Sequence, residues 1–246
     1  ADKSTLTIEK IFAFAKEVDL ADVREVLERQ VRYNMAIAEE GLCGNYGANI
    51  GKVLLATYGD QDVKVRAKAM AAAGSDARMN GCELPVVINS GSGNQGITAS
   101  VPIVVFAKEL QVSEETMYRA LVISNLATIH IKEGIGRLSA YCGAVGAGCG
   151  CGAGIAYLYG EGQKEGEHAI VNGLAIVSGM ICDGAKASSV DAGILGYFMY
   201  KNGQQFIGGD GIVKKGVENT IRCVGKLASE GMLETDREIV HLMIHG

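Results

Sequence analysis

A cysteine that ends an apolar run stands directly before an acid and shortly before a base. The stretch reads SGMICDGAK over residues 178–186 and holds Cys182, Asp183 and Lys186. A free cysteine usually packs as a small hydrophobic residue, and a neighbouring acid and base often form a local ion pair. The same three side chains would also suit a reactive site that contains a thiol, an acid and a base, so they are candidate functional residues.

A second candidate region is the glycine-rich segment NSGSGNQGITASVP, residues 89–102. Ser90, Ser92, Asn94 and Gln95 place hydrogen-bond donors between glycines, which permit left-handed turns. Where such a loop opens into a helix, backbone N–H groups converge and the helix N-terminus attracts negative charge. The pattern predicts a cradle for a carboxylate or phosphate, with a plain surface loop as the alternative.

Two nucleotide-binding motifs are not supported in this segment. It is not a P-loop, because no G-K-[ST] follows. Gly91, Gly93 and Gly96 match the letters of G-x-G-x-x-G. The context of that fingerprint is missing, however, because the preceding strand is doubtful and the next acids, Glu114 and Glu115, look like a helix start.

The elements that must position these residues are predicted to be helices almost throughout, so the fold class is mainly α. Asp19 and Ser113 are suited to cap helices, and Thr235 with Glu238 has the spacing of a capping box. Strand-like patterns are confined to LPVVIN (84–89) and VPIVVFA (101–107), and both also suit the start of a buried helix.

Residues 138–160 form an uncharged run rich in Gly, Ala and Cys. The run is long enough to cross a bilayer, but such small residues gain little from lipid, so a buried helix is favoured over a membrane span. Gly146, Gly150 and Gly154 would share one helix face. Glycine disfavours helix by up to about 1 kcal/mol, so we expect a neighbouring helix or a cofactor to approach closely there.

The amino-acid composition limits the kinds of binding partner and the cellular compartment that we expect for this protein. The chain has 246 residues, of which 48% are hydrophobic, and a net charge of −5. This balance argues against nucleic acid or an anionic membrane surface as a main partner. Seven cysteines, an odd number, and the polar start ADKSTLTIEK favour a cytoplasmic protein without disulfides. Cys149 and Cys151 lack C-x-x-C spacing and are expected to be small buried residues.

Three motifs carry a resemblance to a known family. They are SDARMNGCELPVVINSGSGNQGITASVPIVV (75–105), GRLSAYCGAVGAG (136–148) and VSGMICDGAK (177–186). Together they resemble the iron–sulfur L-cysteine desulfidases, which belong with the alpha-chain domain of bacterial iron–sulfur L-serine dehydratases. The similarity extends over residues 36–51 and 233–243. It implies one helical catalytic domain over residues 1–246, corresponding to the C-terminal part of the family sequence.

The resemblance also implies a 4Fe-4S cluster held by three cysteines, with one iron open to the substrate. Cys142 and Cys182 match two of these ligands. The implied reaction is α,β-elimination of L-cysteine to pyruvate, ammonia and sulfide, or the corresponding reaction of L-serine. Ser90, Ser92, Asn94 and Gln95 would then bind the carboxylate of this small amino acid. The candidate catalytic residues are Lys132, Arg137, Asp183 and Lys186.

Other readings of the charged residues stay open. Lys132 and Arg137 precede Cys142 and could reach the site or form a solvated face. No general base is assigned, because His130 is better explained as a core histidine with a partner. His168, His241 and His245 stand in polar or terminal contexts and are expected to be exposed. If the protein forms an assembly, we expect a homodimer.

The chain departs from the family pattern in two places. It contains no G-C-T-E-P motif, where the family has its third cluster cysteine, and AKASSVDAG (185–193) skips the family's S-C-A-x-K segment. Two alternatives to the desulfidase follow: an L-serine dehydratase, or a non-catalytic helical fragment without a cluster.

Overall fold

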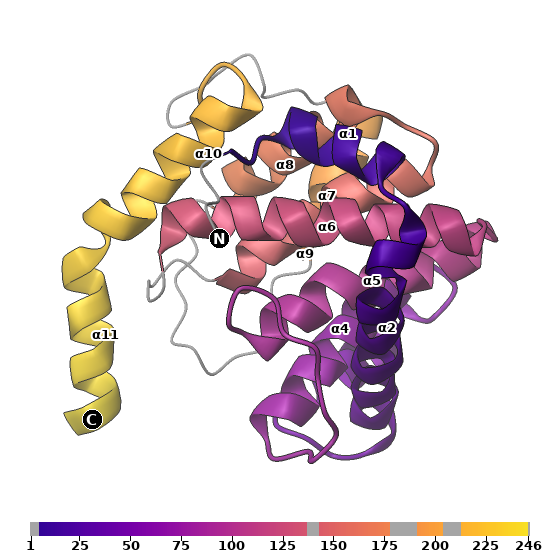
Figure 1. Ribbon diagram of the computed structural model, residues 1–246. Coiled ribbons are helices and arrows are strands. Elements are labelled where there is room, and N and C mark those ends of the chain that lie inside the picture. Colours follow the sequence, from indigo (N-terminus) through magenta and orange to yellow (C-terminus); the bar gives the residue numbers. More distant parts are fainter. Residues whose placement is uncertain (1–4, 137–142, 178–190, 204–212, 246) are drawn as a thin grey trace.

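The computed structural model describes residues 5–136, 143–177, 191–203 and 213–245 (Figure 1). Within these ranges the protein consists of helices with no β-strand, which confirms the predicted fold class. The helices are α1 (Ile8–Glu17), α2 (Leu20–Cys43), α3 (Ile50–Tyr58), α4 (Val63–Met79), α5 (Gly93–Leu110), α6 (Glu114–Ile135), α7 (Gly143–Leu158), α8 (Gln163–Val177), α9 (Asp191–Lys201), α10 (Val217–Lys226), the π-helical turn η1 (Leu227–Gly231) and α11 (Leu233–His245).

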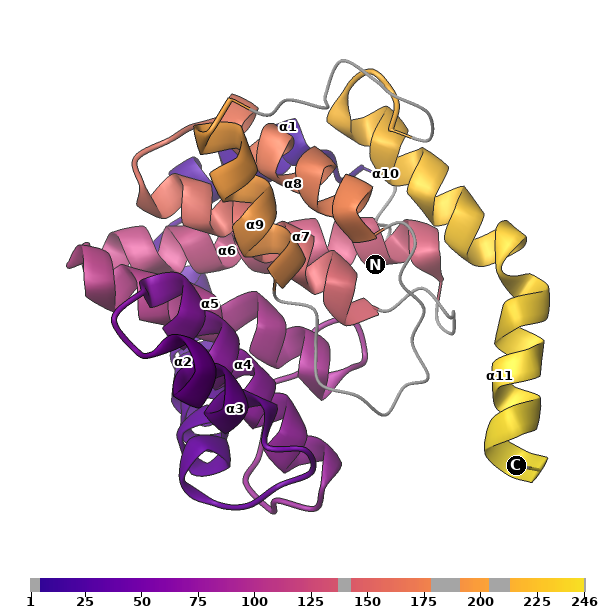
Figure 2. The same ribbon diagram turned by 180° about the vertical axis from the view of Figure 1, so that it is seen from behind.

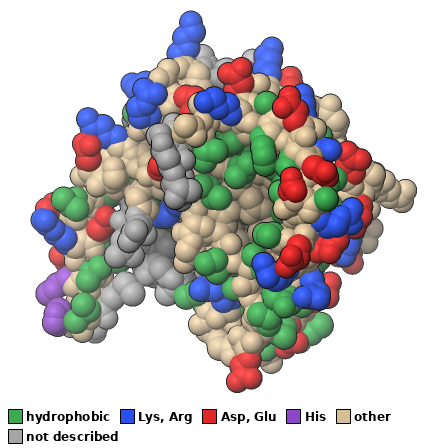
Figure 3. Space-filling view, in the orientation of Figure 1, with side chains coloured by type: hydrophobic (Ala, Val, Ile, Leu, Met, Phe, Trp, Pro, Cys, Tyr) green, Lys and Arg blue, Asp and Glu red, His purple; other side chains and the backbone are tan. Residues whose placement is uncertain are grey.

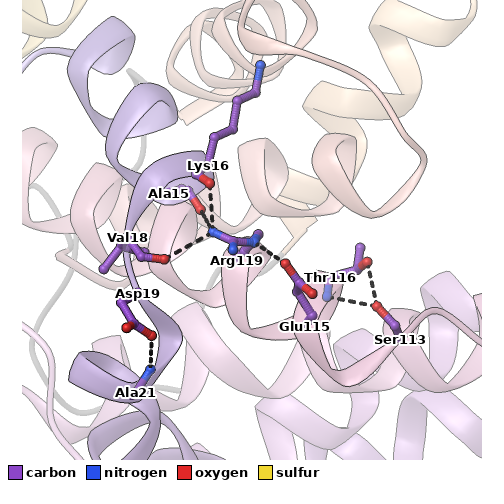
Figure 4. A network of polar contacts seen from close by, with 9 residues as sticks. All are labelled: Ala15, Lys16, Val18, Asp19, Ala21, Ser113, Glu115, Thr116 and Arg119. Carbon is purple, nitrogen blue, oxygen red and sulfur yellow. Dashed lines mark hydrogen bonds and ion pairs between the residues drawn. The ribbon is translucent and has the colours of Figure 1, made fainter.

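Two predicted helix caps are confirmed. The carboxylate of Asp19 accepts a hydrogen bond from the Ala21 N–H at the start of α2, and the Ser113 hydroxyl accepts from the Thr116 N–H at the start of α6 (Figure 4). Each side chain satisfies one of the N–H groups that a helix start leaves without a backbone partner. The predicted capping box at Thr235 is wrong, because α11 begins at Leu233 and already includes this residue.

Arg119 ties the end of α1 to the first turns of α6. Its Nη1 donates to the carbonyl oxygens of Ala15 and Lys16 at 2.6 and 2.9 Å, and its Nε donates to Glu115 at 2.9 Å (Figure 4). The carbonyls at a helix C-terminus lack intrahelical donors and carry partial negative charge. The guanidinium therefore closes α1 and fixes its position on α6 at the same time.

The glycine-rich helix α7 is enclosed by α5, α6, α8 and α9 (Figures 1 and 2). A Cβ on Gly150 would lie 2.8 Å from the Ser124 carbonyl oxygen, and one on Gly154 would lie 2.8 Å from the Ala120 carbonyl oxygen. Gly146 faces the side chain of Ile131 further along α6. Of the two expected reasons for these glycines, the structure shows the first, which is close packing of neighbouring helices.

Cys149 and Cys151 are fully buried in this core, as expected. Burial raises the pKa of Cys149 to about 12 and raises that of Cys151 as well, so both are neutral thiols at physiological pH.

Among the helices that the structure describes, none combines the length and apolar character needed to span a bilayer.

Three further sequence interpretations are now decided. Residues 101–107 lie inside α5, whereas 84–88 are irregular and form no strand. His130 is largely buried and paired with Glu218, as expected. The expected exposure of His168 is wrong: the residue is 2% exposed and its ring stacks on Tyr200 at 4.8 Å. Packing of α9 on α8 through Tyr200 covers His168 despite the charged residues around it in the sequence.

The last helix, α11, stands apart from the helical body in both ribbon views (Figures 1 and 2). It carries four exposed large apolar side chains, which are Leu233, Val240, Leu242 and Ile244. An isolated helix of this length is only marginally stable in water. Its stability therefore depends on η1 and α10, from which it continues.

Glu218 of α10 joins three helices. Its Oε1 accepts the Ile8 N–H at the start of α1 at 2.7 Å, and its Oε2 lies 2.7 Å from His130 Nε2 of α6. Burial alone would raise the pKa of Glu218, but the hydrogen bonds from His130 and Ile8 outweigh it, so the pKa is lowered. The ionised carboxylate therefore holds α1 and α10 on α6.

We predict that Glu218→Gln lowers the free energy of unfolding by about 1 kcal/mol at neutral pH. A lowered folded-state pKa gives stability above the unfolded-state value of about 4.3, and this stability is lost as the pH falls through the folded-state pKa. The difference between wild type and variant in urea unfolding should therefore shrink towards about pH 3. Glu230→Gln, at an exposed pair with Lys226, is the control; equal differences at both pH values would contradict the assignment.

Candidate functional site

The predicted cradle begins with a tight turn at residues 89–92. The Asn89 N–H donates to the Ser92 carbonyl at 3.1 Å, and the Ser92 N–H donates back at 3.0 Å. Ser90 and Gly91 have φ angles of 48° and 85°, as a type I′ turn requires. Since only one of these two residues is glycine, the turn must be held by its surroundings.

A cluster of amide side chains anchors the turn to the helices α2 and α6. Asn89 Nδ2 donates to Oδ1 of Asn125 on α6 at 2.9 Å. The amides of Asn125 and Gln30, on α2, exchange two hydrogen bonds of 2.8 and 2.9 Å. The turn is therefore fixed to both long helices, which makes the position of the following helix start equally fixed.

The helix α5 starts directly after this turn without a side-chain cap. Ser92 occupies the N-cap position, but its hydroxyl makes no capping hydrogen bond. The N–H groups of Gly93, Asn94 and Gln95 in the first turn therefore have no partner within the helix. A rigid turn followed by free N–H groups and the positive end of a helix is suited to bind an anion.

Two glycines make this arrangement possible. A Cβ on Gly96 would overlap the Val87 carbonyl oxygen, and a Cβ on Gly93 would overlap the Arg78 side chain. Val87 is held in place by the side chain of Asn34. The Val87 N–H donates to Asn34 Oδ1 at 2.8 Å, and Asn34 Nδ2 donates to the Val87 carbonyl at 3.1 Å. The first turn of α5 is thus pressed against the preceding segment and against the end of α4.

The side chains around the first turn differ in their partners. Asn94 Oδ1 accepts from Arg78 Nη1 at 3.2 Å. Gln95 is 5% exposed, and its Oε1 is buried without a hydrogen-bond partner. Its amide lies against Gly143, where an added Cβ would come within 2.5 Å of Nε2. The N-termini of α5 and α7 therefore meet at the Gln95 amide.

Other predicted site residues fall near this meeting point or outside the described ranges. Lys132 lies half-buried in the last turn of α6, whose C-terminal part packs along the beginning of α7. Arg137, Cys142, Cys182, Asp183 and Lys186 lie outside the described residues. Gly143 is the residue after Cys142 in the sequence, so the loop and one cysteine motif adjoin in the fold.

The part of the chain that the structure describes holds no group of three His, Cys, Asp or Glu side chains that could bind a metal. Its five cysteines are free thiols, of which Cys43 is exposed.

A cavity of about 350 Å³ lies on the other side of the turn, between α1, α2 and α6. It is lined mainly by apolar side chains, and hydrophobic residues gather between charged ones on this face (Figure 3). Of the predicted loop residues only Ser90 reaches it, whereas Ser92, Asn94 and Gln95 do not. The cavity and the free N–H groups of α5 are therefore separate features.

The sequence analysis did not identify three residues that shape this candidate site, namely Arg78, Asn89 and Asn125. Arg78 and Asn89 lie within the 75–105 motif, but their side chains resemble those of any surface helix or loop. Asn125 gives no signal at all, because a polar residue within a helix is usually solvated.

These observations define a class of protein: an all-helical domain in which a tight turn leads into an uncapped helix start, and this helix start lies against the beginning of a glycine-rich core helix. The particular family follows from sequence comparison. The sequence profile described as "Serine dehydratase alpha chain" matches residues 3–241, and the chain belongs to this family.

The similar curated proteins are bacterial. A UPF0597 protein of Desulfitobacterium hafniense is 63% identical over 99% of this chain and 58% of its own length. UPF0597 proteins of Lachnoclostridium phytofermentans and Treponema denticola are 56% and 46% identical, again over 99% of this chain. The chain spans only 58–60% of the length of these relatives. No solved structure matches it.

We predict that Gly96→Ala lowers the free energy of unfolding by about 2 kcal/mol, because neither Val87 nor α5 can move away from the new methyl group. Gly231→Ala is the matched control, since only the end of the Leu227 side chain lies near that glycine. Urea unfolding of both variants measures the effect. Equal stability of Gly96→Ala and wild type would show that the contact at Val87 is not rigid.

Proposed function

We propose that the protein is a lyase that eliminates the β-substituent of a small amino acid, with L-cysteine favoured over L-serine. The observation that carries this proposal is the contact between the Gln95 amide and Gly143. It joins the anion-binding first turn of α5 to the segment that begins directly after Cys142. The proposal concerns the whole protein, because the chain spans about three fifths of its relatives.

The first turn of α5 would bind the carboxylate of the substrate. The N–H groups of Gly93, Asn94 and Gln95 have no acceptor within the helix and would donate to this carboxylate, and the helix end stabilises negative charge by about 0.3–1 kcal/mol, or more when partly buried. Ser90, Ser92, Asn94 and Gln95 surround this point in the sequence. The turn is fixed by the Asn125 network before any ligand arrives, so little order has to be gained on binding.

The donor set of the chain fits an iron–sulfur cluster in part. Cys142 and Cys182 would hold a 4Fe-4S cluster, with a third thiolate from outside this chain, since no other described cysteine belongs to a metal-binding group. Cys149 and Cys151 are fully buried within the core and belong to no group of three metal-binding side chains among the described residues. Soft thiolates are the ligands that such clusters prefer, and a cluster with an open iron supplies a Lewis acid.

The reaction requires two bonds to break. A base takes the proton from Cα, and the Cβ–S bond breaks with its electron pair on sulfur, which leaves as sulfide. The resulting aminoacrylate is hydrolysed to pyruvate and ammonia. Lys132, Arg137, Asp183 and Lys186 are the candidates to carry these protons or to hold the carboxylate. A site that excludes water around the first turn of α5 would protect the intermediate.

L-serine is the second candidate substrate, because the family is that of the serine dehydratases. A thiolate is the better leaving group and bonds well to iron, whereas a hydroxyl needs a proton donor. The third possibility is a helical fragment without a cluster, since the described residues alone offer no complete ligand set.

We predict that protein reconstituted with iron and sulfide without oxygen has a higher kcat/KM for L-cysteine than for L-serine. Pyruvate and sulfide release measure the two reactions, and iron and acid-labile sulfide assays measure the cluster. Cys142→Ser and Cys182→Ser should lose the cluster, while Cys43→Ser, at an exposed thiol, should keep it. A preference for serine would move the protein to the dehydratases, and absence of bound iron in wild type would favour the fragment.

We predict that Asn94→Ala lowers kcat/KM at least about tenfold, since the side chain both borders the carboxylate position and orients Arg78. Asn202→Ala is a matched control, because Asn202 is an exposed asparagine at the end of α9 that bonds only to a local carbonyl. Unchanged kinetics of Asn94→Ala would remove the first turn of α5 from the site.

A further inference from the structure

Arg78 is an arginine without an acidic partner in the part of the chain that the structure describes. Its Nη1 donates to Asn94 Oδ1 and to the Met79 sulfur, each at 3.2 Å. Its side chain lies flat on Gly93, the first residue of α5, and only glycine leaves room for it there. A half-buried guanidinium normally pairs with a carboxylate, often through two parallel hydrogen bonds. Arg78 is therefore ready to receive one from a ligand.

Gln95, two residues after Gly93 in the first turn of α5, offers a hydrogen-bond acceptor instead of a donor. Its Oε1 is a buried acceptor with no hydrogen-bond partner among the described residues, and such an unpaired group costs roughly 1–3 kcal/mol unless a donor arrives. The residue is 5% exposed and its amide is held against Gly143, so it cannot turn out to water. A ligand with a strong donor would satisfy this oxygen.

We infer that Arg78 and Gln95 together recognise a zwitterionic α-amino acid. The carboxylate would lie between Arg78 and the free N–H groups of α5, and the ammonium group would donate to Gln95 Oε1. Arg78, from the end of α4, lies against Gly93 and bonds to Asn94, and Gln95 is the next residue of the same first turn of α5. The carboxylate offsets the repulsion that the helix end exerts on an ammonium group. This inference rests on the proposed function and assigns the groups that select its substrate.

The test uses the full chain and three ligands that cannot undergo elimination: L-alanine, propionate and ethylamine. Isothermal titration calorimetry measures their dissociation constants. Arg78→Gln should weaken binding of L-alanine and of propionate at least about tenfold, without affecting ethylamine. Gln95→Leu should weaken L-alanine at least about tenfold and leave propionate unchanged, because propionate has no ammonium group.

Conservative variants distinguish a loss of ligand binding from a general disturbance of the fold. Gln95→Glu keeps the acceptor and should bind L-alanine at least as tightly as wild type. Arg78→Lys keeps the charge but loses the paired hydrogen bonds, so it should lie between wild type and Arg78→Gln. Arg66→Gln is the matched control on the same helix, because Arg66 pairs with Glu109 on the surface and should leave all three ligands unchanged. Thermal unfolding of each variant shows that it is folded.

The outcomes distinguish this inference from the proposed function. If Arg78→Gln binds L-alanine within about twofold of wild type, or if Gln95→Leu weakens propionate as much as L-alanine, the inference is wrong even when L-cysteine is turned over. If neither L-cysteine nor L-serine is turned over, the proposed lyase is wrong. The binding of L-alanine to the variants then still decides whether this site recognises amino acids.

Discussion

Direct contact between helix backbones is the constraint on which the rest of the structure depends. In α7 the carbonyl oxygen of Gly148 lies where a Cβ of Gly193 on α9 would be, and a Cβ on Gly152 would lie 2.5 Å from the Gly193 carbonyl oxygen. Glycine disfavours helix, so α7 is stable only because four helices surround it. The same close packing places its N-terminus beside that of α5, where the Gln95 amide meets Gly143.

This packing fixes the position of the candidate site, and the turn before α5 supplies its polar groups. The amides of Asn89, Asn125 and Gln30 fix the turn to α2 and α6 through side-chain hydrogen bonds rather than through a metal or a disulfide. The Gln95 amide lies against the first residue of α7, and the guanidinium of Arg78 lies against the first residue of α5. If the proposed ligand binds there, these groups would stabilise its negative charge without having to rearrange.

The sequence predicted those features that depend on local pattern. Caps at Asp19 and Ser113 and the glycine face of α7 follow from residue type and helical period, and both are found. The roles of Arg78 and Asn125 could not be predicted, because they depend on which helices lie side by side. The failure at Thr235 has a local cause: the π-helical turn η1 continues the chain almost directly into α11, so no cap is needed.

The burial of Cys149 and Cys151 gives the protein an internal probe of its own motion. Burial raises the pKa of Cys149 far above that of an exposed thiol, so this side chain stays protonated at pH 8, and it is also closed to solvent. An alkylating reagent can react with it only after α7 has separated from its neighbours. The rate of its modification, beside the immediate reaction of exposed Cys43, therefore reports the free energy at which the core opens.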